Sequence, residues 1–80
     1  MKITIAELLK IIAKSLDVKV SKINIKTKSL ELEAWDSLGQ LAILSSLDKK
    51  FKGKVNLDTI ASAQSISIIV NYLNKKGILK

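Results

Sequence analysis

The sequence predicts an all-α fold in which three main helices and one short helix form a small bundle, with a long loop between the first two main helices. Apolar residues recur at the i, i+3, i+4, i+7 spacing of an amphipathic helix in three separate segments. Their apolar faces have similar widths, which is typical of helices that pack together in a bundle. The chain has 80 residues and no internal repeat. This length predicts a single domain, residues 1–80, with a small core.

The first helix is expected from about Thr4 to Leu16. Thr4 and Glu7 stand three residues apart, which is the spacing of a capping box at a helix start. Lys10 and Lys14 fall four residues apart on the outer face. The apolar stripe that we expect to face the core consists of Ile5, Leu8, Leu9, Ile12 and Leu16.

Residues 17–35 are expected to form a long loop. Apolar residues alternate with polar ones from Val18 to Ile25, as in a strand, but the sequence offers no second strand to pair with it. We therefore expect Ile23, Ile25 and Leu30 to enter the core from a loop. Loops of more than about 12–15 residues are uncommon and are often functional.

The second helix is expected to run from Asp36 or Ser37 to about residue 52. Asp36 is a suitable N-cap, and Gly53 is suited to end the helix. Lys49 and Lys50 lie in the last turn, where the helix dipole favours cations. The predicted buried stripe consists of Leu41, Leu44, Leu47 and Phe51.

A short helix is expected over Asn56–Ala61, followed by a last helix from the N-cap Ser65 to just before Gly77. Lys75 and Lys76 suit the C-terminal end of this last helix, again because of the helix dipole. Its predicted apolar stripe consists of Ile66, Ile69, Val70 and Leu73.

The composition excludes many kinds of site. The chain contains no Cys and no His. This removes disulfides, thiolate and imidazole metal ligands, Cys nucleophiles and His bases, so we expect neither a metal site nor an enzyme. No apolar run approaches the ~18 residues of a membrane span, and the N-terminal residues lack the features of a secretory leader. We therefore expect a soluble, cytoplasmic protein without a membrane partner.

The charge is unevenly distributed along the chain. All 14 basic residues are Lys, and the net charge is +7. Residues 1–30 carry +5 and residues 49–80 carry +6, whereas residues 31–48 carry −4, from Glu31, Glu33, Asp36 and Asp48. One alternative is a basic helical module that docks on nucleic acid or on an acidic partner. It would place six lysines on one continuous face: Lys10, Lys14, Lys49, Lys50, Lys52 and Lys54. The absence of Arg and the presence of only three aromatic residues disfavour it, so no nucleic-acid partner is expected.

The candidate site lies in the segment Trp35-Asp36-Ser37-Leu38-Gly39-Gln40-Leu41. Three interpretations of Ser37 compete. Asp-Ser before an apolar run is common as a plain helix cap. A hydrolytic nucleophile would need a positioned base, but the chain has no His and no Lys between residues 29 and 48. The third interpretation is a modification site, because the free N–H groups and the dipole of a helix N-terminus suit a covalently attached phosphodiester.

The sequence resembles the acyl carrier proteins, small helical domains in which a serine carries a 4′-phosphopantetheine arm. In that family the serine belongs to an Asp-Ser-Leu motif at the start of the second helix, which Asp36-Ser37-Leu38 matches. The resemblance covers nearly the whole chain, since an amphipathic helix and a long loop precede the motif. Later matches are Phe51 with Gly53, Val55, Leu57–Ile60, Ser65-Ile66, Val70 and Tyr72. The residues Trp35, Gly39 and Gln40 make the motif more similar to small stand-alone carriers of specialised pathways.

The resemblance implies an acyl-carrier-type bundle and a monomeric, non-catalytic carrier. A phosphopantetheinyl transferase would attach 4′-phosphopantetheine from coenzyme A to Ser37, and the arm would hold acyl groups as thioesters for acyl-loading and acyl-transferring enzymes. The residues that it implies in partner recognition are Asp36, Leu38, Trp35, Glu31, Glu33 and Asp48. Acyl cargo would fold back between the second and third helices against Ile43, Val55, Ile60 and Ala63.

The chain departs from the family in its charge. Fatty-acid carriers are acidic, whereas this chain is basic, and its second helix has Gly39, Ala42 and Ser45 where acids or a larger apolar residue are expected. Like charges across an interface can cost several kcal/mol, so we expect dedicated partners rather than those of the usual carriers. The cargo stays open between fatty acyl, polyketide or sugar-pathway acyl groups and, in a peptidyl or D-alanyl carrier, an amino acid.

Overall fold

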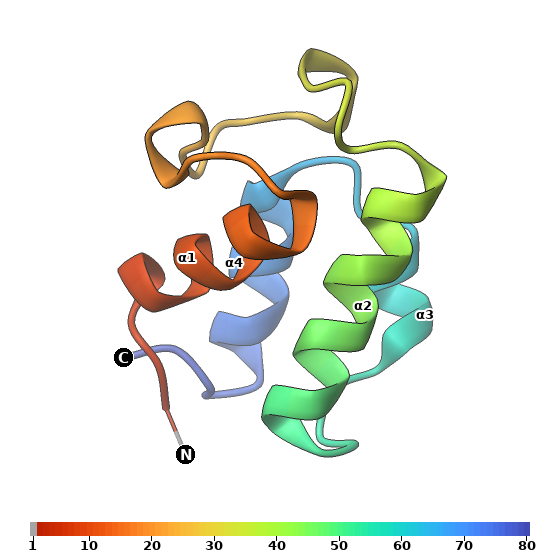
Figure 1. Ribbon diagram of the computed structural model, residues 1–80. Coiled ribbons are helices and arrows are strands. Elements are labelled where there is room, and N and C mark those ends of the chain that lie inside the picture. The colour runs from red at the N-terminus through yellow and green to blue at the C-terminus, as the bar shows by residue number, and fades with distance from the viewer. Residues whose placement is uncertain (1) are drawn as a thin grey trace.

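Four α-helices form the architecture of the computed structural model, which describes residues 2–80 (Figure 1). They are α1 (Ile5–Leu16), α2 (Ser37–Phe51), α3 (Leu57–Ala61) and α4 (Ile66–Lys75). Two short 3-10 turns, η1 (Val20–Lys22) and η2 (Ser29–Glu31), lie in the loop between α1 and α2. Residues 2–80 contain isolated β-bridges but no β-strand. The predicted all-α class, with three longer helices, one short helix and a long loop, is therefore confirmed.

The starts of α1, α2 and α4 follow the predicted caps, and Asn56, which was expected as the first residue of the short helix, is the N-cap of α3. Thr4 and Glu7 form a capping box before α1: Glu7 N–H donates to Thr4 Oγ1 and Thr4 N–H donates to Glu7 Oε1, each at 3.1 Å. The side chains of Asp36, Asn56 and Ser65 accept hydrogen bonds from the first turns of α2, α3 and α4. Because a capping side chain acts on N–H groups two or three residues away, these boundaries are local properties of the sequence.

α2 packs against α1 on one side and against α3 on the other. In Figure 1, α1 crosses α4 on the left of the view, and the loop between α1 and α2 passes over the top of the bundle. The two ends of the chain lie together, because Ile3 N–H donates to the Ile78 carbonyl and Lys80 N–H donates to the Ile3 carbonyl, both at 2.9 Å. Ile78 and Leu79 are buried there, although the sequence analysis assigned them to no element.

The core combines side chains from all four helices with Ile3. Its fully buried large members are Ile3, Leu8, Ile12, Ile43, Leu47, Ile60, Ile66, Ile69 and Leu73. In α1 and α4, three residues of the predicted stripes differ: Ile5 is exposed, and Leu9 and Val70 are only partly buried. Ile5 shares a face with Ile12 but lies in the first turn of α1, at the edge of the core.

The buried face of α2 is not the predicted one. It consists of Gly39, Ile43, Leu47 and Phe51, whereas Leu41 is 60% exposed and Leu44 is only partly buried. The cause is Gly39, which lies against Leu16 of α1 and the main chain of Ala34, with no room for a side chain. This contact turns the Gly39 face of α2 inward, so Leu41 points to the surface.

The loop between α1 and α2 also departs from the prediction. Ile23 is buried as expected, but Ile25 is 42% exposed and Leu30 is 98% exposed. Ile25 lies inside a tight turn, in which the Thr27 hydroxyl accepts from Asn24 N–H at 2.9 Å.

Two backbone bonds fix the second half of this loop to the start of α4. Ile66 N–H donates to the Thr27 carbonyl at 3.0 Å, and Ser29 N–H donates to the Gln64 carbonyl at 2.7 Å. The main chain of residues 27–29 thus makes the contact with α4, while the Leu30 side chain of η2 remains in solvent.

Candidate functional site

Ser37 is the first residue of α2, and it is exposed. The N-cap before it is Asp36, whose Oδ1 accepts from Gly39 N–H at 2.9 Å and whose carbonyl accepts from Gln40 N–H at 2.8 Å. The N–H groups of Ser37 and Leu38 have no carbonyl four positions back in the helix to bind. With the helix dipole, they place partial positive charge beside the Ser37 hydroxyl. The site therefore combines an accessible hydroxyl with a backbone that favours an anion.

A groove of about 570 Å³ lies beside Ser37. Its walls come from the loop before α2, the first half of α2, and the segment that joins α3 to α4. It is lined by Ser29, Trp35, Asp36, Ser37, Gln40, Leu41, Leu44, Ala61, Ala63 and Gln64. We call this the Ser37 groove. Its lining mixes hydroxyl and amide groups with aliphatic side chains.

The side chain of Gln40 forms hydrogen bonds to two other parts of the Ser37 groove. Its side-chain oxygen accepts from the indole N–H of Trp35, and its amide nitrogen donates to the carbonyls of Ile60 at 2.7 Å and Ala61 at 3.1 Å. Trp35 itself is only 6% exposed, so it acts as a packed anchor with an edge at the groove. These bonds connect Trp35, which precedes the N-cap of α2, with the C-terminal end of α3.

Exposed aliphatic side chains surround the same end of the molecule. Leu38 is 75% exposed, beside Ser37, and Leu41 lies one turn further along α2. Leu30 and the exposed Ile68 line a second pocket of about 260 Å³, together with Lys28, Ser29, Gln64 and Ser65. Ser29 and Gln64 line both pockets, so the two hollows adjoin. Apolar side chains grouped on a surface are typical of a protein–protein contact.

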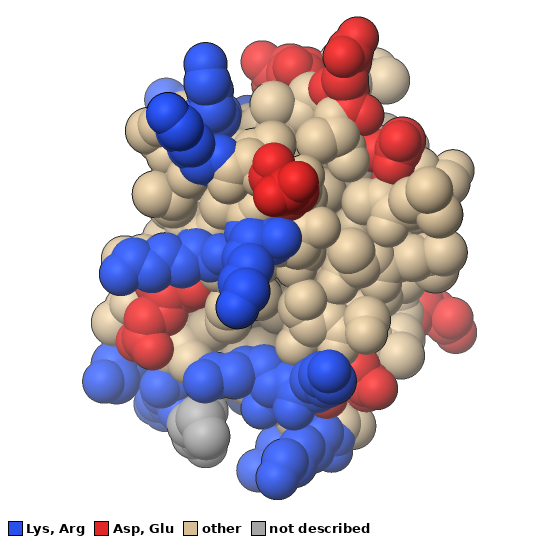
Figure 2. All heavy atoms as spheres, in the orientation of Figure 1, with Lys and Arg blue, Asp and Glu red and all other residues tan. Residues whose placement is uncertain are grey.

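The acidic residues predicted to take part in recognition separate into two groups. Glu31, Glu33 and Asp36 are exposed and lie in the loop that leads into Ser37. Asp48 lies eleven residues beyond Ser37, roughly 16 Å along the axis of α2. Figure 2 shows acidic side chains at the top of the view, near this loop, and the densest group of Lys side chains at the bottom, near the C-terminal end of α2. Only the first group therefore lies at the Ser37 end.

The residues predicted to line an acyl pocket do not come together at the Ser37 groove. Ile43, Val55 and Ile60 are core residues, and none of them lines it. Ala63 does line it. The groove instead uses Gln40, Leu41, Leu44 and Gln64, none of which was predicted to line the acyl pocket, although Gln40 and Leu41 belong to the predicted site segment. The sequence signal that could have indicated the groove was Gln40, a polar residue three positions after Ser37 in a helix that was assigned from its apolar stripe.

The lysines that a nucleic-acid-binding module would use form two neighbouring groups. Lys14, Lys49 and Lys50 line a groove between α1 and α2, and Lys50, Lys52 and Lys54 line a smaller one. Lys10 lines neither.

Comparisons of this chain with protein-family models, with curated proteins and with solved structures found no match. No helix in residues 2–80 has the length and apolarity needed to cross a membrane. In the same part of the chain, no three side chains of His, Cys, Asp or Glu are placed to hold a metal ion. Any assignment of function therefore depends on the residues around Ser37.

Proposed function

We propose that this chain is a carrier protein of the acyl carrier type, in which the Ser37 hydroxyl bears a 4′-phosphopantetheine group. The observation that carries the proposal is the position of Ser37. It is exposed at the first residue of α2, between the capping residue Asp36 and the exposed Leu38, and it lines the groove. The resemblance of the sequence to acyl carrier proteins, which extends along nearly the whole chain, supports the same conclusion.

The attachment needs only a nucleophilic oxygen from this chain. Ser37 Oγ forms a bond to the phosphorus of coenzyme A that bears the pantetheine, and the bond from that phosphorus to 3′,5′-ADP breaks. The hydroxyl proton passes to a base of a separate phosphopantetheinyl transferase. Asp36 does not have to be that base, because the transferase supplies it; Asp36 Oδ1 caps α2 by accepting the Gly39 N–H. A reaction in which this chain supplies only the hydroxyl and the transferase supplies the base fits a chain without His or Cys.

The surroundings of Ser37 fit an attached phosphodiester. The N–H groups of Ser37 and Leu38 are available at the positive end of the α2 dipole, where a phosphate is stabilised. When bound, 4′-phosphopantetheine supplies a terminal thiol that carries an acyl group as a thioester, and this Cys-free chain has no thiol of its own. The amides of Gln40 and Gln64 and the aliphatic Leu41 and Leu44 are the groups that would hold the arm or its cargo.

The partners of such a carrier would bind the Ser37 end. Leu38 and Leu41 offer apolar contact, and Glu31, Glu33 and Asp36 offer negative charge. The cargo class, acyl or aminoacyl, stays open, because aliphatic and amide groups line the groove together.

Intact-mass measurement tests the proposal. The protein is incubated with a broad-specificity phosphopantetheinyl transferase, coenzyme A and Mg²⁺, alongside Ser37→Ala and the matched control Ser45→Ala, which changes an exposed serine of the same helix. We expect one added phosphopantetheine on the wild type and on Ser45→Ala, and none on Ser37→Ala. A folded wild-type protein that gains no mass, with the transferase active on a known carrier, would overturn the proposal.

A further inference from the structure

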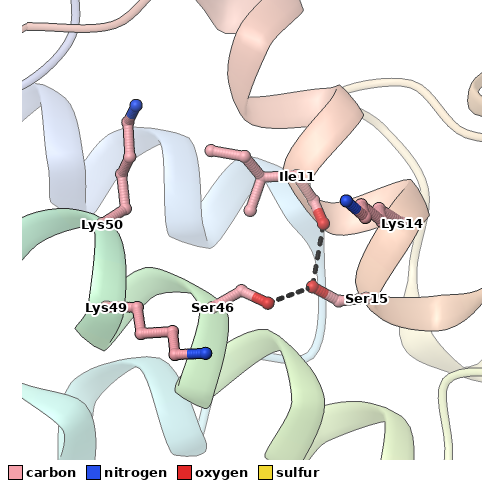
Figure 3. A pocket seen from close by; sticks show the side chains of 6 residues that line it. All are labelled: Ile11, Lys14, Ser15, Ser46, Lys49 and Lys50. Atoms are coloured by element: carbon pink, nitrogen blue, oxygen red, sulfur yellow. Dashed lines mark hydrogen bonds between the residues drawn. The ribbon is translucent and has the colours of Figure 1, made fainter.

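A second groove lies between α1 and α2, on a different part of the surface from Ser37. It has a volume of about 510 Å³ and is lined by Ile11, Lys14, Ser15, Ser46, Lys49 and Lys50 (Figure 3). We call it the α1–α2 groove. Lys49 lies twelve residues beyond Ser37 on α2, which is roughly 18 Å along the helix axis. A partner bound here would leave Ser37 uncovered.

The two serines in this groove offer no proton to a ligand. The Ser15 hydroxyl donates to the Ile11 carbonyl at 2.8 Å, so its single hydrogen is already used. The Ser46 hydroxyl lies 2.7 Å from Ser15 Oγ and must therefore be the donor in that bond. Both hydroxyls present only lone pairs. An anion in the groove is therefore attracted by the lysine ammonium groups alone, which argues against a compact site for a small phosphate.

The positive charge continues beyond the groove. Lys50 also lines a neighbouring hollow of about 160 Å³ with Phe51, Lys52, Lys54 and Ile78. Lys14, Lys49, Lys50, Lys52 and Lys54 thus line two hollows that meet at Lys50, and the exposed Asp48 precedes Lys49 in the chain. We call these five lysines the lysine surface. Figure 2 shows Lys side chains along the bottom of the view, from the two ends of the chain to the C-terminal end of α2, with an acidic group beside them.

One acid, Glu7 of α1, interacts weakly with Lys50, but its carboxylate is held in the capping box at the start of α1. Its Oε1 accepts from Thr4 N–H and from Thr4 Oγ1. These bonds, and more weakly Lys80 and Lys50, lower the pKa of Glu7.

We propose that the lysine surface docks an acidic, amphipathic helix of a partner protein. The carboxylates of such a helix pair with the lysines, and its apolar side chains rest on Ile11 and on the aliphatic stems of Lys14 and Lys49 at the α1–α2 groove. A protein fits this surface better than a nucleic acid does. The chain has no Arg to read bases, and Trp35 and Phe51 are buried and offer no ring for stacking. The proposal does not require that Ser37 be modified.

The test uses a fluorescently labelled, Glu-rich peptide with leucines at helical spacing, and binding is followed by fluorescence anisotropy. All proteins carry Ser37→Ala, so the outcome is independent of the carrier proposal. The first variant is Lys14→Gln/Lys49→Gln/Lys50→Gln. The control is Lys19→Gln/Lys22→Gln/Lys26→Gln, which removes the same charge from exposed lysines of the loop between α1 and α2. A second peptide has the same charge, but its leucines are scrambled.

We expect the groove variant to weaken binding about tenfold and the loop variant to weaken it less than about twofold, because only the first removes facing charges. The scrambled peptide should bind more weakly than the amphipathic one. Equal losses in the two variants, or equal binding of the two peptides, would mean unspecific charge attraction and would overturn the proposal. Tighter binding of duplex DNA than of the peptide at physiological salt would overturn it in favour of a nucleic-acid partner.

Discussion

The indole N–H of Trp35 donates a hydrogen bond to the side-chain oxygen of Gln40. Through the amide nitrogen of Gln40, this contact continues to the carbonyls of Ile60 and Ala61 at the C-terminal end of α3. Carbonyls in the last turn of a helix lack intrahelical donors and need other partners. The side chain of Gln40 thus holds Trp35, which precedes the N-cap of α2, the first turn of α2 and the end of α3 in a fixed relation, and all three lie at the Ser37 groove.

Replacing Gln40 with Leu should destabilise the protein by about 1–3 kcal/mol, because the indole N–H of the buried Trp35 loses its acceptor. Urea unfolding followed by Trp35 fluorescence measures this. The control is Gln64→Leu, which changes an exposed glutamine in the same groove and should alter stability by less than about 0.5 kcal/mol. Equal effects of the two substitutions would show that the hydrogen bonds of Gln40 do not matter for stability.

Gly39→Ala should also destabilise the protein, although alanine is the better helix former. A Cβ at Gly39 would lie 2.7 Å from Leu16 Cδ2 and would overlap the Ala34 carbonyl oxygen. Because the carbonyl is main chain, the loop or the helix has to shift, at a cost of about 1–3 kcal/mol that exceeds the gain of up to about 1 kcal/mol in helix propensity.

The test is whether Gly39→Ala lowers or raises the stability of the protein. Ser45→Ala, at an exposed position of the same helix, should leave stability unchanged or raise it by about 0.5 kcal/mol. Thermal unfolding of the two variants compares them directly. A Gly39→Ala variant more stable than the wild type would contradict the close packing of α2 on Leu16.

Gly39 also separates the features that could be predicted from the sequence from those that could not. The caps at Thr4, Asp36 and Ser65 were predicted because each depends on a side chain and an N–H two or three residues away. The buried face of α2 was not predicted correctly. Which face of α2 turns inward is set by Gly39, and glycine has no side chain to contribute to an apolar pattern. Leu41 was therefore placed in the core, although it lies in the wall of the Ser37 groove.

The remaining differences have the same origin in contacts between distant parts of the chain. Leu30 is apolar but exposed, because the main chain of residues 27–29 rather than a side chain of η2 joins α4. Ile78 and Leu79 are buried because they pair with Ile3, 75 or more residues away in sequence. In the candidate site, the position of Ser37 at the start of α2 was predicted, whereas the bonds of Gln40 to α3 follow only from the tertiary structure.

Glu7 should make stability depend on pH in the acid range. The N–H of Thr4, then the hydroxyl of Thr4, and more weakly Lys80 and Lys50, lower the pKa of Glu7 below its ordinary value of 4.5. The folded state therefore binds fewer protons at this group than the unfolded state does. The stabilisation is present above pH 4.5 and is lost as the pH falls through the lowered folded-state pKa.

Chemical denaturation at neutral pH and at about pH 3 measures this loss. Glu7→Gln keeps an acceptor for Thr4 but does not titrate, so it should lose less stability on acidification than the wild type. Glu33→Gln, which removes an exposed charge elsewhere, is the control for the change in net charge. If Glu7→Gln and the wild type lose the same stability, the capping box makes no contribution to the acid dependence.

Asp36 should have two separable roles, one in the helix and one in the attachment to Ser37. Asp36→Ala removes the acceptor of the Gly39 N–H and should cost about 0.5–2 kcal/mol of stability, whereas Asp36→Asn keeps a capping oxygen and should cost little. Both variants lack the negative charge beside Ser37. We therefore expect both to be loaded about tenfold more slowly by a phosphopantetheinyl transferase, since a charge at an interface acts on association.

Unfolding curves and the initial rate of mass gain, measured on the same protein samples, separate the two roles of Asp36. If Asp36→Asn were loaded at the wild-type rate, the carboxylate charge would have no part in recognition and only its capping oxygen would matter. If Asp36→Asn were as unstable as Asp36→Ala, the stabilisation would come from the charge at the helix dipole rather than from the hydrogen bond. We expect slower loading of both variants and a loss of stability in Asp36→Ala alone. This combination follows from an exposed N-cap next to an exposed serine.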